Sequence, residues 1–278
     1  MSNARLVAAD QLPPATLHQA FGQAFSDYLI GPFQLSLAQW PGFLARQAVA
    51  LGLSRVALNA LGEPLAFALV APRPGRWRLA TMGATPPARG SGAAPMLLDD
   101  FVERAGTAGV QAVELEVFAQ NERAVRLYRS RGFATVHELH GYERAAQGGP
   151  AQAPGWQALP REQALAWLRA NEPADLPLQL GATVLEQHPE GWTAWQQGHA
   201  LLVWVKAGER LQILSLIDLQ PGQPDAERLV AALAASEPSL ALFAPQLQRQ
   251  DLGGQALQRL GFKRAALHQW LMVRSLAG

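Results

Sequence analysis

A glycine-rich stretch in the first half of the chain carries the strongest chemical signal. Residues 82–94 read MGATPPARGSGAA, in which a predicted strand leads into a turn and the turn opens a helix. Glycines let the backbone come close to a bulky anion, and the free N–H groups and dipole at a helix N-terminus hold phosphate. Arg89 adds a fixed positive charge with several donors. The stretch therefore predicts a site for a phosphate-bearing ligand.

Short glycine-rich loops also occur as ordinary turns, so the stretch alone leaves that alternative open. The pattern that ends in a phosphate-binding lysine is absent. The dinucleotide-binding fingerprint also fails, because the glycine spacing is wrong and no acidic residue ends a following strand at the required distance. ATP and NAD are therefore poor candidates for the ligand.

A second signal follows thirty residues downstream, where residues 115–133 read LEVFAQNERAVRLYRSRGF. Asn121, Ala124 and Tyr128 are spaced i, i+3 and i+7, so they share one face of a predicted helix. The small Ala124 lets a ligand lie against that face. Each residue also has a purely structural interpretation: Asn121 suits a helix N-cap, and Tyr128 suits a half-buried packing position. Gly132 and Phe133 are interpreted as a helix end and a core residue, with no chemical role.

The two stretches, in this order and at this separation, resemble the GNAT (Gcn5-related N-acetyltransferase) superfamily. That family pairs an Arg/Gln-x-x-Gly-x-Gly/Ala loop with a later Asn-x-x-Ala-x-x-x-Tyr and a Gly-Phe. Residues 89–94 match the first pattern, and residues 121–133 match the second. The resemblance covers roughly residues 20–143 and is strongest over 76–133.

The resemblance implies an α/β fold, with a mixed central sheet flanked by helices and two strands that splay apart to admit coenzyme A. Acetyl-CoA is then the expected co-substrate, with its pantetheine along the first splayed strand and its pyrophosphate on the loop amides. The cofactor-binding residues implied in this way are Met82, Gly83, Ala84, Arg89, Gly90, Ser91, Gly92, Ala93, Ala94, Asn121, Ala124 and Tyr128.

The reaction implied is transfer of an acetyl group to a primary amine by direct attack in a ternary complex. The chain has no cysteine, which excludes a cysteinyl acyl-enzyme within it. Tyr128 is the expected general acid toward the leaving sulfur, and a backbone N–H near Ala84 the expected oxyanion donor. Because free amines are mostly protonated at neutral pH, a base is needed. Glu116 is the candidate, with Glu114 on the same face of the strand, and ion pairing of both carboxylates is the alternative.

The elements that must position these residues alternate between strands and helices. In the first half, the apolar spacing and turn residues predict helices over 12–24, 36–51, 91–106 and 121–131, and strands over 55–60, 64–71, 76–82, 113–118 and 134–142. Ser36 is the expected N-cap of its helix. This order predicts an α/β sheet.

The second half repeats that order. Strands are expected over 192–196, 200–205, 211–219, 240–244 and 265–273, and helices over 161–169, 226–236 and 254–260. The sequence LQRLGF at 257–262 resembles LYRSRGF at 127–133, which indicates an internal repeat. The glycines and prolines of 146–160 predict a linker. The expectation is a catalytic GNAT domain over 1–145, a linker over 146–160, and a degenerate GNAT-like domain over 161–278.

The second domain is expected to lack a cofactor site. No Arg-x-x-Gly-x-Gly/Ala follows the strand at 211–219, and Pro221 and Pro224 remove amides that a phosphate would need. Counting back from Phe262 places Leu257 where Tyr128 lies in the first half, and leucine cannot donate a proton.

The composition of the chain narrows the classes of function and the kinds of partner that remain. The net charge of +1 argues against general binding to nucleic acid or membranes, and the sequence has no 18-residue apolar run and no signal-like start. A cytoplasmic protein without a metal site, monomeric or homodimeric, is expected. The acceptor, a small-molecule amine or a peptide N-terminus, is not identified. The alternative functions are a noncatalytic acyl-CoA-binding or sensing module and a scaffold that binds a protein partner.

Overall fold

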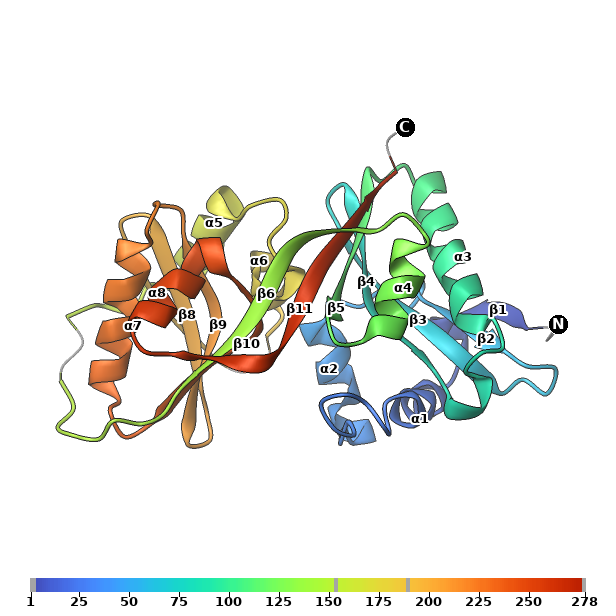
Figure 1. The fold of residues 1–278 in the computed structure, drawn as a ribbon, viewed down its shortest axis with the longest axis horizontal. Helices are drawn as coiled ribbons and strands as arrows, with labels where there is room; N and C mark the ends of the chain where they lie inside the picture. The colour runs from blue at the N-terminus through green and yellow to red at the C-terminus, as the bar shows by residue number, and fades with distance from the viewer. Residues whose placement is uncertain (1–3, 153–154, 189–190, 277–278) are drawn as a thin grey trace. The chain divides into compact units, whose positions relative to one another are not determined.

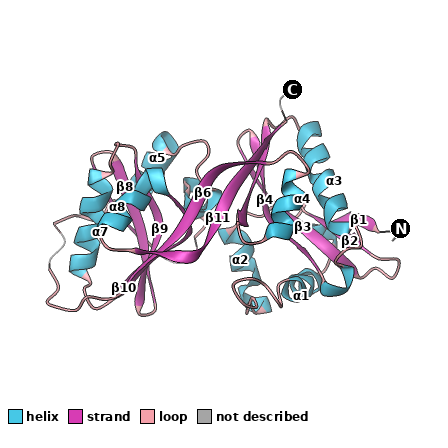
Figure 2. Cartoon of the chain, viewed as in Figure 1, coloured by secondary structure: helices cyan, strands magenta, loops and turns pink. Residues whose placement is uncertain are grey.

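A computed structural model describes residues 4–152, 155–188 and 191–276 and divides the chain into two compact units (Figures 1 and 2). The first unit holds the chain up to Val117, then Asn121–Val136, and the chain end from Met272. The second holds Phe118–Gln120 and His137–Leu271. The described strands hydrogen-bond in the order β1-β2-β3-β4-β5-β11-β6-β10-β9-β8-β7. Helices flank a mixed sheet, which confirms the predicted fold class.

Two strands, β6 (Ala134–Arg144) and β11 (Lys263–Ser275), contribute residues to both units. The other elements of the first unit follow the predicted order, with an additional short strand at the start. They are β1 (Arg5–Ala8), α1 (Pro14–Ala24), α2 (Trp40–Arg46), β2 (Arg55–Leu58), β3 (Pro64–Arg73), β4 (Arg76–Ala84), α3 (Ala93–Thr107), β5 (Ala112–Phe118) and α4 (Glu122–Arg129).

Helices α1 and α3 cover opposite faces of the first unit's strands. Phe21 of α1 contacts Phe67 of β3, with ring centroids 6.0 Å apart. On the other face, Trp77 of β4 contacts Phe101 of α3, with centroids 6.4 Å apart. In Figure 1, strands β3 and β4 run between the two helices. Both helices bury one apolar stripe, as their sequence periodicity predicts.

The parallel strands β4 and β5 part half-way along their length. They pair from Arg76 opposite Ala112 to Leu79 opposite Leu115, and β4 then continues to Ala84 and β5 to Phe118 without further pairing between them. On the other side of β4, the pairing with β3 shifts by one residue at Ala80. Such a bulge bends a strand and increases its twist. The parting therefore opens the sheet directly before the glycine-rich loop.

The second unit has two layers of helices on a twisted sheet. One apolar cluster joins α7 and α8 to the strands, and another joins α5 and α6 to the opposite face. Alternation along β8 explains the two faces, since Leu202 belongs to the first cluster and Leu201 and Val203 to the second. The elements are α5 (Arg161–Asn171), α6 (Ala182–Glu186), β7 (Thr193–Gln197), β8 (Ala200–Ala207), β9 (Arg210–Asp218), α7 (Pro224–Ser236), β10 (Ala241–Arg249) and α8 (Gln255–Arg259).

The two compact units differ from the predicted domain boundaries, because β6 and β11 each contribute residues to both units. Residues from His137 to the end of β6 lie in the second unit, and the end of β11 from Met272 lies in the first. Within 146–152 and 155–160, the predicted linker has neither helix nor strand, but it is bonded to the second unit. Gly148 N donates to Pro238 O at 2.9 Å, and Leu159 N donates to Ala194 O at 2.8 Å. The predicted domains are contiguous in sequence, whereas each compact unit combines segments that are distant in the chain.

One predicted helix, 36–51, is shorter than expected. Ser36 is the N-cap of a 3-10 turn through a reciprocal pair of bonds with Gln39, and α2 then ends at Arg46. Ala48 has φ +51°, which an α-helix cannot continue through. The apolar residues after it therefore pack as turns against α1 and β3 rather than as a helical face.

Candidate active site

The glycine-rich loop presents backbone amides to solvent at the start of α3. Gly90, Ser91 and Gly92 are exposed, and both glycines have left-handed backbones, with φ of +84° and +91°. Ser91 N donates to Ala88 O at 3.1 Å. The amides of Gly90, Gly92 and Ala94 donate to no residue that the structure describes. The loop thus has the unbonded amides and helix N-terminus that an anion needs.

Arg89 is engaged differently from the prediction. Its guanidinium donates to both carboxylate oxygens of Asp27, at 2.5 and 2.6 Å, and to the carbonyl of Ala24 at 3.2 Å. This hydrogen bonding lowers the pKa of Asp27 and raises that of Arg89. The predicted positive charge is therefore neutralised by a carboxylate, and the backbone amides remain as the unpaired donors of the loop.

The three strand residues expected to face pantetheine lie at the end of β4, beyond its last pair with β5. Met82, Gly83 and Ala84 are all half-buried. They pair with β3 on one side only. The free side of this strand end faces the gap between β4 and β5, where a ligand's amides would find a backbone to pair with.

Helix α4 places the second motif as its spacing predicts. The Asn121 side chain caps the helix by accepting a hydrogen bond from Ala124 N at 3.2 Å, so its structural interpretation is confirmed. Asn121 and Ala124 are half-buried and Tyr128 is buried, whereas Glu122, Arg123 and Arg126 are exposed. The motif residues therefore occupy the covered face of α4.

The Tyr128 hydroxyl donates to no residue that the structure describes, and the ring packs edge-on against Phe133 at 6.0 Å. Burial raises the pKa of Tyr128, and the nearby phenol of Tyr28 raises it further. The phenol consequently keeps its proton at neutral pH, as an acid must before it reacts.

Glu116 and Glu114 share one face of β5, as predicted, and both are ion-paired. Glu116 Oε2 accepts from Arg78 at 2.7 Å (Nε) and 2.6 Å (Nη2), with both side chains almost fully buried. Its Oε1 is buried without a partner among the described residues. Glu114 is held by Arg73 and Arg76, at 2.9 and 3.2 Å. The ion-pair alternative is thus realised, and one oxygen of Glu116 is left uncommitted.

The second unit has the same strand irregularities as the first. Its parallel strands β9 and β10 pair only from Arg210 to Gln212 before they part. The pairing of β9 with β8 shifts by one residue at Leu214. Leu214 is the fifth residue of β9, as Ala80 is the fifth residue of β4. The last residues of β9, Leu216–Asp218, therefore correspond to Met82–Ala84.

Protein side chains fill this gap in the second unit. Gln248 Nε2 donates to the strand carbonyl of Leu216 at 3.1 Å. The Asp218 carboxylate accepts from the first amides of α7, those of Asp225 at 3.0 Å and Ala226 at 2.9 Å. Gln223 bridges the loop before α7 to the start of α8, through Gln250 O and Ala256 N. Gln248, Asp218 and Gln223 are each no more than 2 % exposed.

The ends of α4 and α8 also share their geometry. Phe133 N donates to Tyr128 O at 3.2 Å, and Phe262 N donates to Leu257 O at 3.1 Å. The glycine before each phenylalanine has nearly the same φ, +80° at Gly132 and +79° at Gly261. The sequence alignment of Leu257 with Tyr128 is therefore matched by their local structure.

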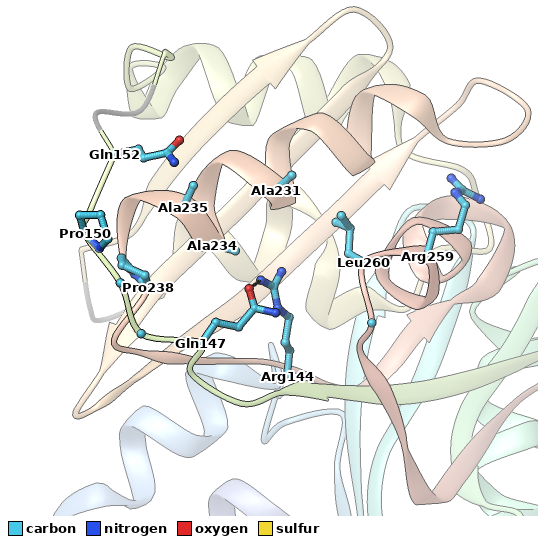
Figure 3. A pocket seen from close by; sticks show the side chains of 13 residues that line it. Arg144, Gln147, Pro150, Gln152, Ala231, Ala234, Ala235, Pro238, Arg259 and Leu260 are labelled. Atoms are coloured by element: carbon cyan, nitrogen blue, oxygen red, sulfur yellow. Dashed lines mark hydrogen bonds between the residues drawn. The ribbon is translucent and has the colours of Figure 1, made fainter.

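A pocket of about 620 Å³ lies elsewhere in the second unit (Figure 3). Ala231, Ala234 and Ala235 line it from the C-terminal half of α7, where the helix dipole is negative. Its two arginines are already engaged: Arg144 donates to Gln147, and Arg259 donates to Glu227 at 2.7 Å. The pocket therefore lacks the features of a pyrophosphate site.

Several residues of these sites were not found from the sequence. In the first unit they are Asp27, Tyr28, Arg78, and Gln47, whose Oε1 accepts from Arg78 Nη1 at 3.1 Å. In the second unit they are Asp218, Gln223 and Gln248. Asp27 had a usable signal, because it is the only acidic residue between Asp10 and Glu63. The others have no local pattern. In the part of the chain that the structure describes, no three His, Cys, Asp or Glu side chains gather as metal ligands, and no helix is long and apolar enough to cross a bilayer.

Comparison with known proteins agrees with this geometry. Residues 16–133 match the model of the acetyltransferase (GNAT) family. No curated protein matches the chain. The GCN5-related N-acetyltransferase of Sphaerobacter thermophilus is similar in structure, with a TM-score of 0.65 and 15 % identity over 98 % of this chain and 96 % of that one. That of Anabaena variabilis has a TM-score of 0.65 and 14 % identity, over 99 % of this chain and 73 % of that one. That of Kribbella flavida has a TM-score of 0.61 and 16 % identity, over 99 % of this chain and 72 % of that one. At these identities the likeness shows a shared fold, which includes both units.

Proposed function

Given that residues 16–133 match the GNAT acetyltransferase family, we propose that the first unit is an acetyl-CoA-dependent N-acetyltransferase. It transfers the acetyl group to a primary amine by direct attack in a ternary complex. The N–C bond forms as the C–S bond breaks, one proton leaves the amine, and one reaches the departing sulfur.

The observation that carries the proposal is the parting of β4 and β5 beside a loop with unbonded amides. The gap starts after Leu79 and Leu115, and the exposed amides of Gly90 and Gly92 lie at the start of the next helix. An elongated ligand with amides at one end and a pyrophosphate at the other fits this arrangement. Coenzyme A has that chemistry, and the acetyl thioester supplies the group transferred.

Tyr128 is proposed as the acid that protonates the leaving sulfur. Its side chain is buried, its raised pKa keeps the hydroxyl protonated, and that hydroxyl donates to no residue that the structure describes. The thiolate sulfur of the cofactor is the acceptor that the reaction would offer.

Glu116 is proposed as the base through its uncommitted Oε1, directly or through water. The variant Glu116→Gln should lower kcat about 10²-fold. It should also destabilise the fold by roughly 3–5 kcal/mol, because Arg78 is left buried without its partner. Steady-state kinetics and denaturant unfolding measure the two effects.

A double variant separates the two roles of Glu116. In Arg78→Gln with Glu116→Gln, both charges are gone, so much of the lost stability should return while kcat stays low. Recovery of activity together with stability would show that Glu116 acts only in the ion pair.

The second unit is proposed to be a degenerate GNAT-like domain without a cofactor site. Gln248, Asp218 and Gln223 there take the hydrogen bonds that a cofactor would make in the first unit. The carboxylate of Asp218 also repels a phosphate from the α7 amides. Leu257 stands where an acid would be needed.

Calorimetric titration with acetyl-CoA should therefore give one bound molecule per chain. Two molecules per chain would contradict the proposal for the second unit, and no binding would contradict the proposed function itself. Binding without turnover of any amine in a broad screen would instead support a noncatalytic acyl-CoA-binding or sensing module.

A further inference from the structure

The segment of residues 26–37, which follows α1, borders the proposed reaction centre. Ahead of it, Ala24 and Phe25 pack so closely on Gly83 that a Cβ there would lie 2.9 and 3.3 Å from them. Asp27 is bonded to Arg89 of the glycine-rich loop. These contacts place the start of the segment beside the end of β4 and beside the loop at the N-terminus of α3.

Tyr28, in the same segment, adds to the rise in the pKa of Tyr128 that burial causes. Tyr28 contacts the ring of Phe33, with centroids 6.2 Å apart, and Phe33 in turn contacts Phe21 and Phe25. Phe33 is nevertheless 37 % exposed. A series of contacting aromatic rings therefore leads from Tyr28 to the surface.

This surface is apolar and almost without charge. Most of the large apolar side chains that are exposed in the described chain come from this one segment: Leu29 at 44 %, Ile30 at 51 %, Phe33 at 37 % and Leu37 at 47 %. We call these four side chains the apolar loop. Between Tyr28 and Ser54 the only charged residue is Arg46, and no residue is acidic. Asp27, just before, is committed to Arg89.

We propose that the acceptor is a small amine with an uncharged, apolar body, which lies on the apolar loop while its amino group reaches the thioester beside Tyr128. This inference rests on the proposed function and names its substrate class. An apolar body gains by leaving water on this surface. A second ammonium group would meet no carboxylate in the segment, so polyamines are disfavoured.

Two amines of equal length test the proposal. Hexylamine and 1,6-diaminohexane differ only in the second amino group. The kcat/KM for hexylamine should be at least about tenfold higher, because the distal ammonium of the diamine loses hydration without gaining a partner. Across propylamine to hexylamine, kcat/KM should rise up to about fourfold per methylene.

One variant in the apolar loop and one control variant test whether the apolar loop binds the amine. Ile30→Ser changes a half-exposed side chain, so the fold should survive, and KM for hexylamine should rise about fivefold with unchanged acetyl-CoA affinity. Leu61→Ser is the control, since Leu61 is 83 % exposed in the turn between β2 and β3. It should change neither constant.

Three outcomes would overturn the inference: equal or better use of 1,6-diaminohexane, an unchanged KM for hexylamine in Ile30→Ser, or a dimer in sedimentation that Ile30→Ser dissociates. The last would assign the apolar loop to a second copy of the chain. Because acetyl-CoA binding and amine-dependent release of coenzyme A are measured in the same experiments, failure of the proposed function is told apart from failure of this inference.

Discussion

Replacing Tyr128 with phenylalanine should lower kcat on the order of 10²-fold or more while acetyl-CoA affinity hardly changes. The variant keeps the ring, which packs on Phe133, and removes only the hydroxyl. A proton given to a leaving group acts in the transition state, so the loss belongs in kcat rather than in KM. Single-turnover kinetics on an accepted amine, with the chemical step shown to be rate-limiting, is the measurement. Full activity in this variant would leave Tyr128 as a packing residue.

The pH dependence gives an independent check on the same residue. The protonated phenol is the active form, and burial raises its pKa above the ordinary value near 10. The contribution of the phenol to kcat is therefore present at all pH values below the raised pKa and is lost only as the pH rises through it. Up to about pH 10, the kcat of the wild type should therefore show no decline with rising pH that is absent from Tyr128→Phe. A decline centred near pH 8 and absent from the variant would contradict the buried, protonated state.

The second large effect is expected at Gly92, at the start of α3. Acetyl-CoA at about 100 times its Kd should add about 2.7 kcal/mol to the free energy of unfolding of the wild type, which raises the Tm. Gly92→Asp should abolish that shift, because it sets a negative charge among the amides proposed to hold the pyrophosphate. Thermal unfolding with and without acetyl-CoA measures it.

Gly92→Asn is the matched control for charge. Asparagine and aspartate have the same size and both tolerate a left-handed backbone such as φ +91°, and a Cβ at this position meets nothing within 4 Å. The Asn variant should fold like the Asp variant and retain more of the acetyl-CoA shift. An Asp variant that binds like the wild type would place the pyrophosphate elsewhere.

The local features of the fold could be predicted from the sequence. Helix periodicity predicted α1, α3 and α4, and the cap roles of Ser36 and Asn121 follow from side chains that bond within three residues. The positive φ of Gly90 and Gly92 is also a local feature, since glycine adopts such a backbone freely. These features depend on neighbours along the chain, so composition and spacing are sufficient to find them.

The partners of the charged and polar side chains could not be predicted. Arg89 was expected to face a phosphate, but its partner is Asp27, 62 residues away. Glu116 was left between a base and an ion pair, and Arg78, 38 residues away, decides that it is paired. In the second unit, the prolines indicated a missing site, but Gln248 fills the strand gap from 32 residues beyond Leu216.

The sequence by itself determined the order of elements, the two motifs and their correspondence between the halves, because each is written in residues a few positions apart. Only the tertiary structure decided where β4 and β5 part, which strands the two units exchange, and which carboxylates are neutralised. Those outcomes depend on which distant surfaces are buried together. A buried charge or amide takes whatever partner the packed fold brings within hydrogen-bond reach, and no local pattern records that choice.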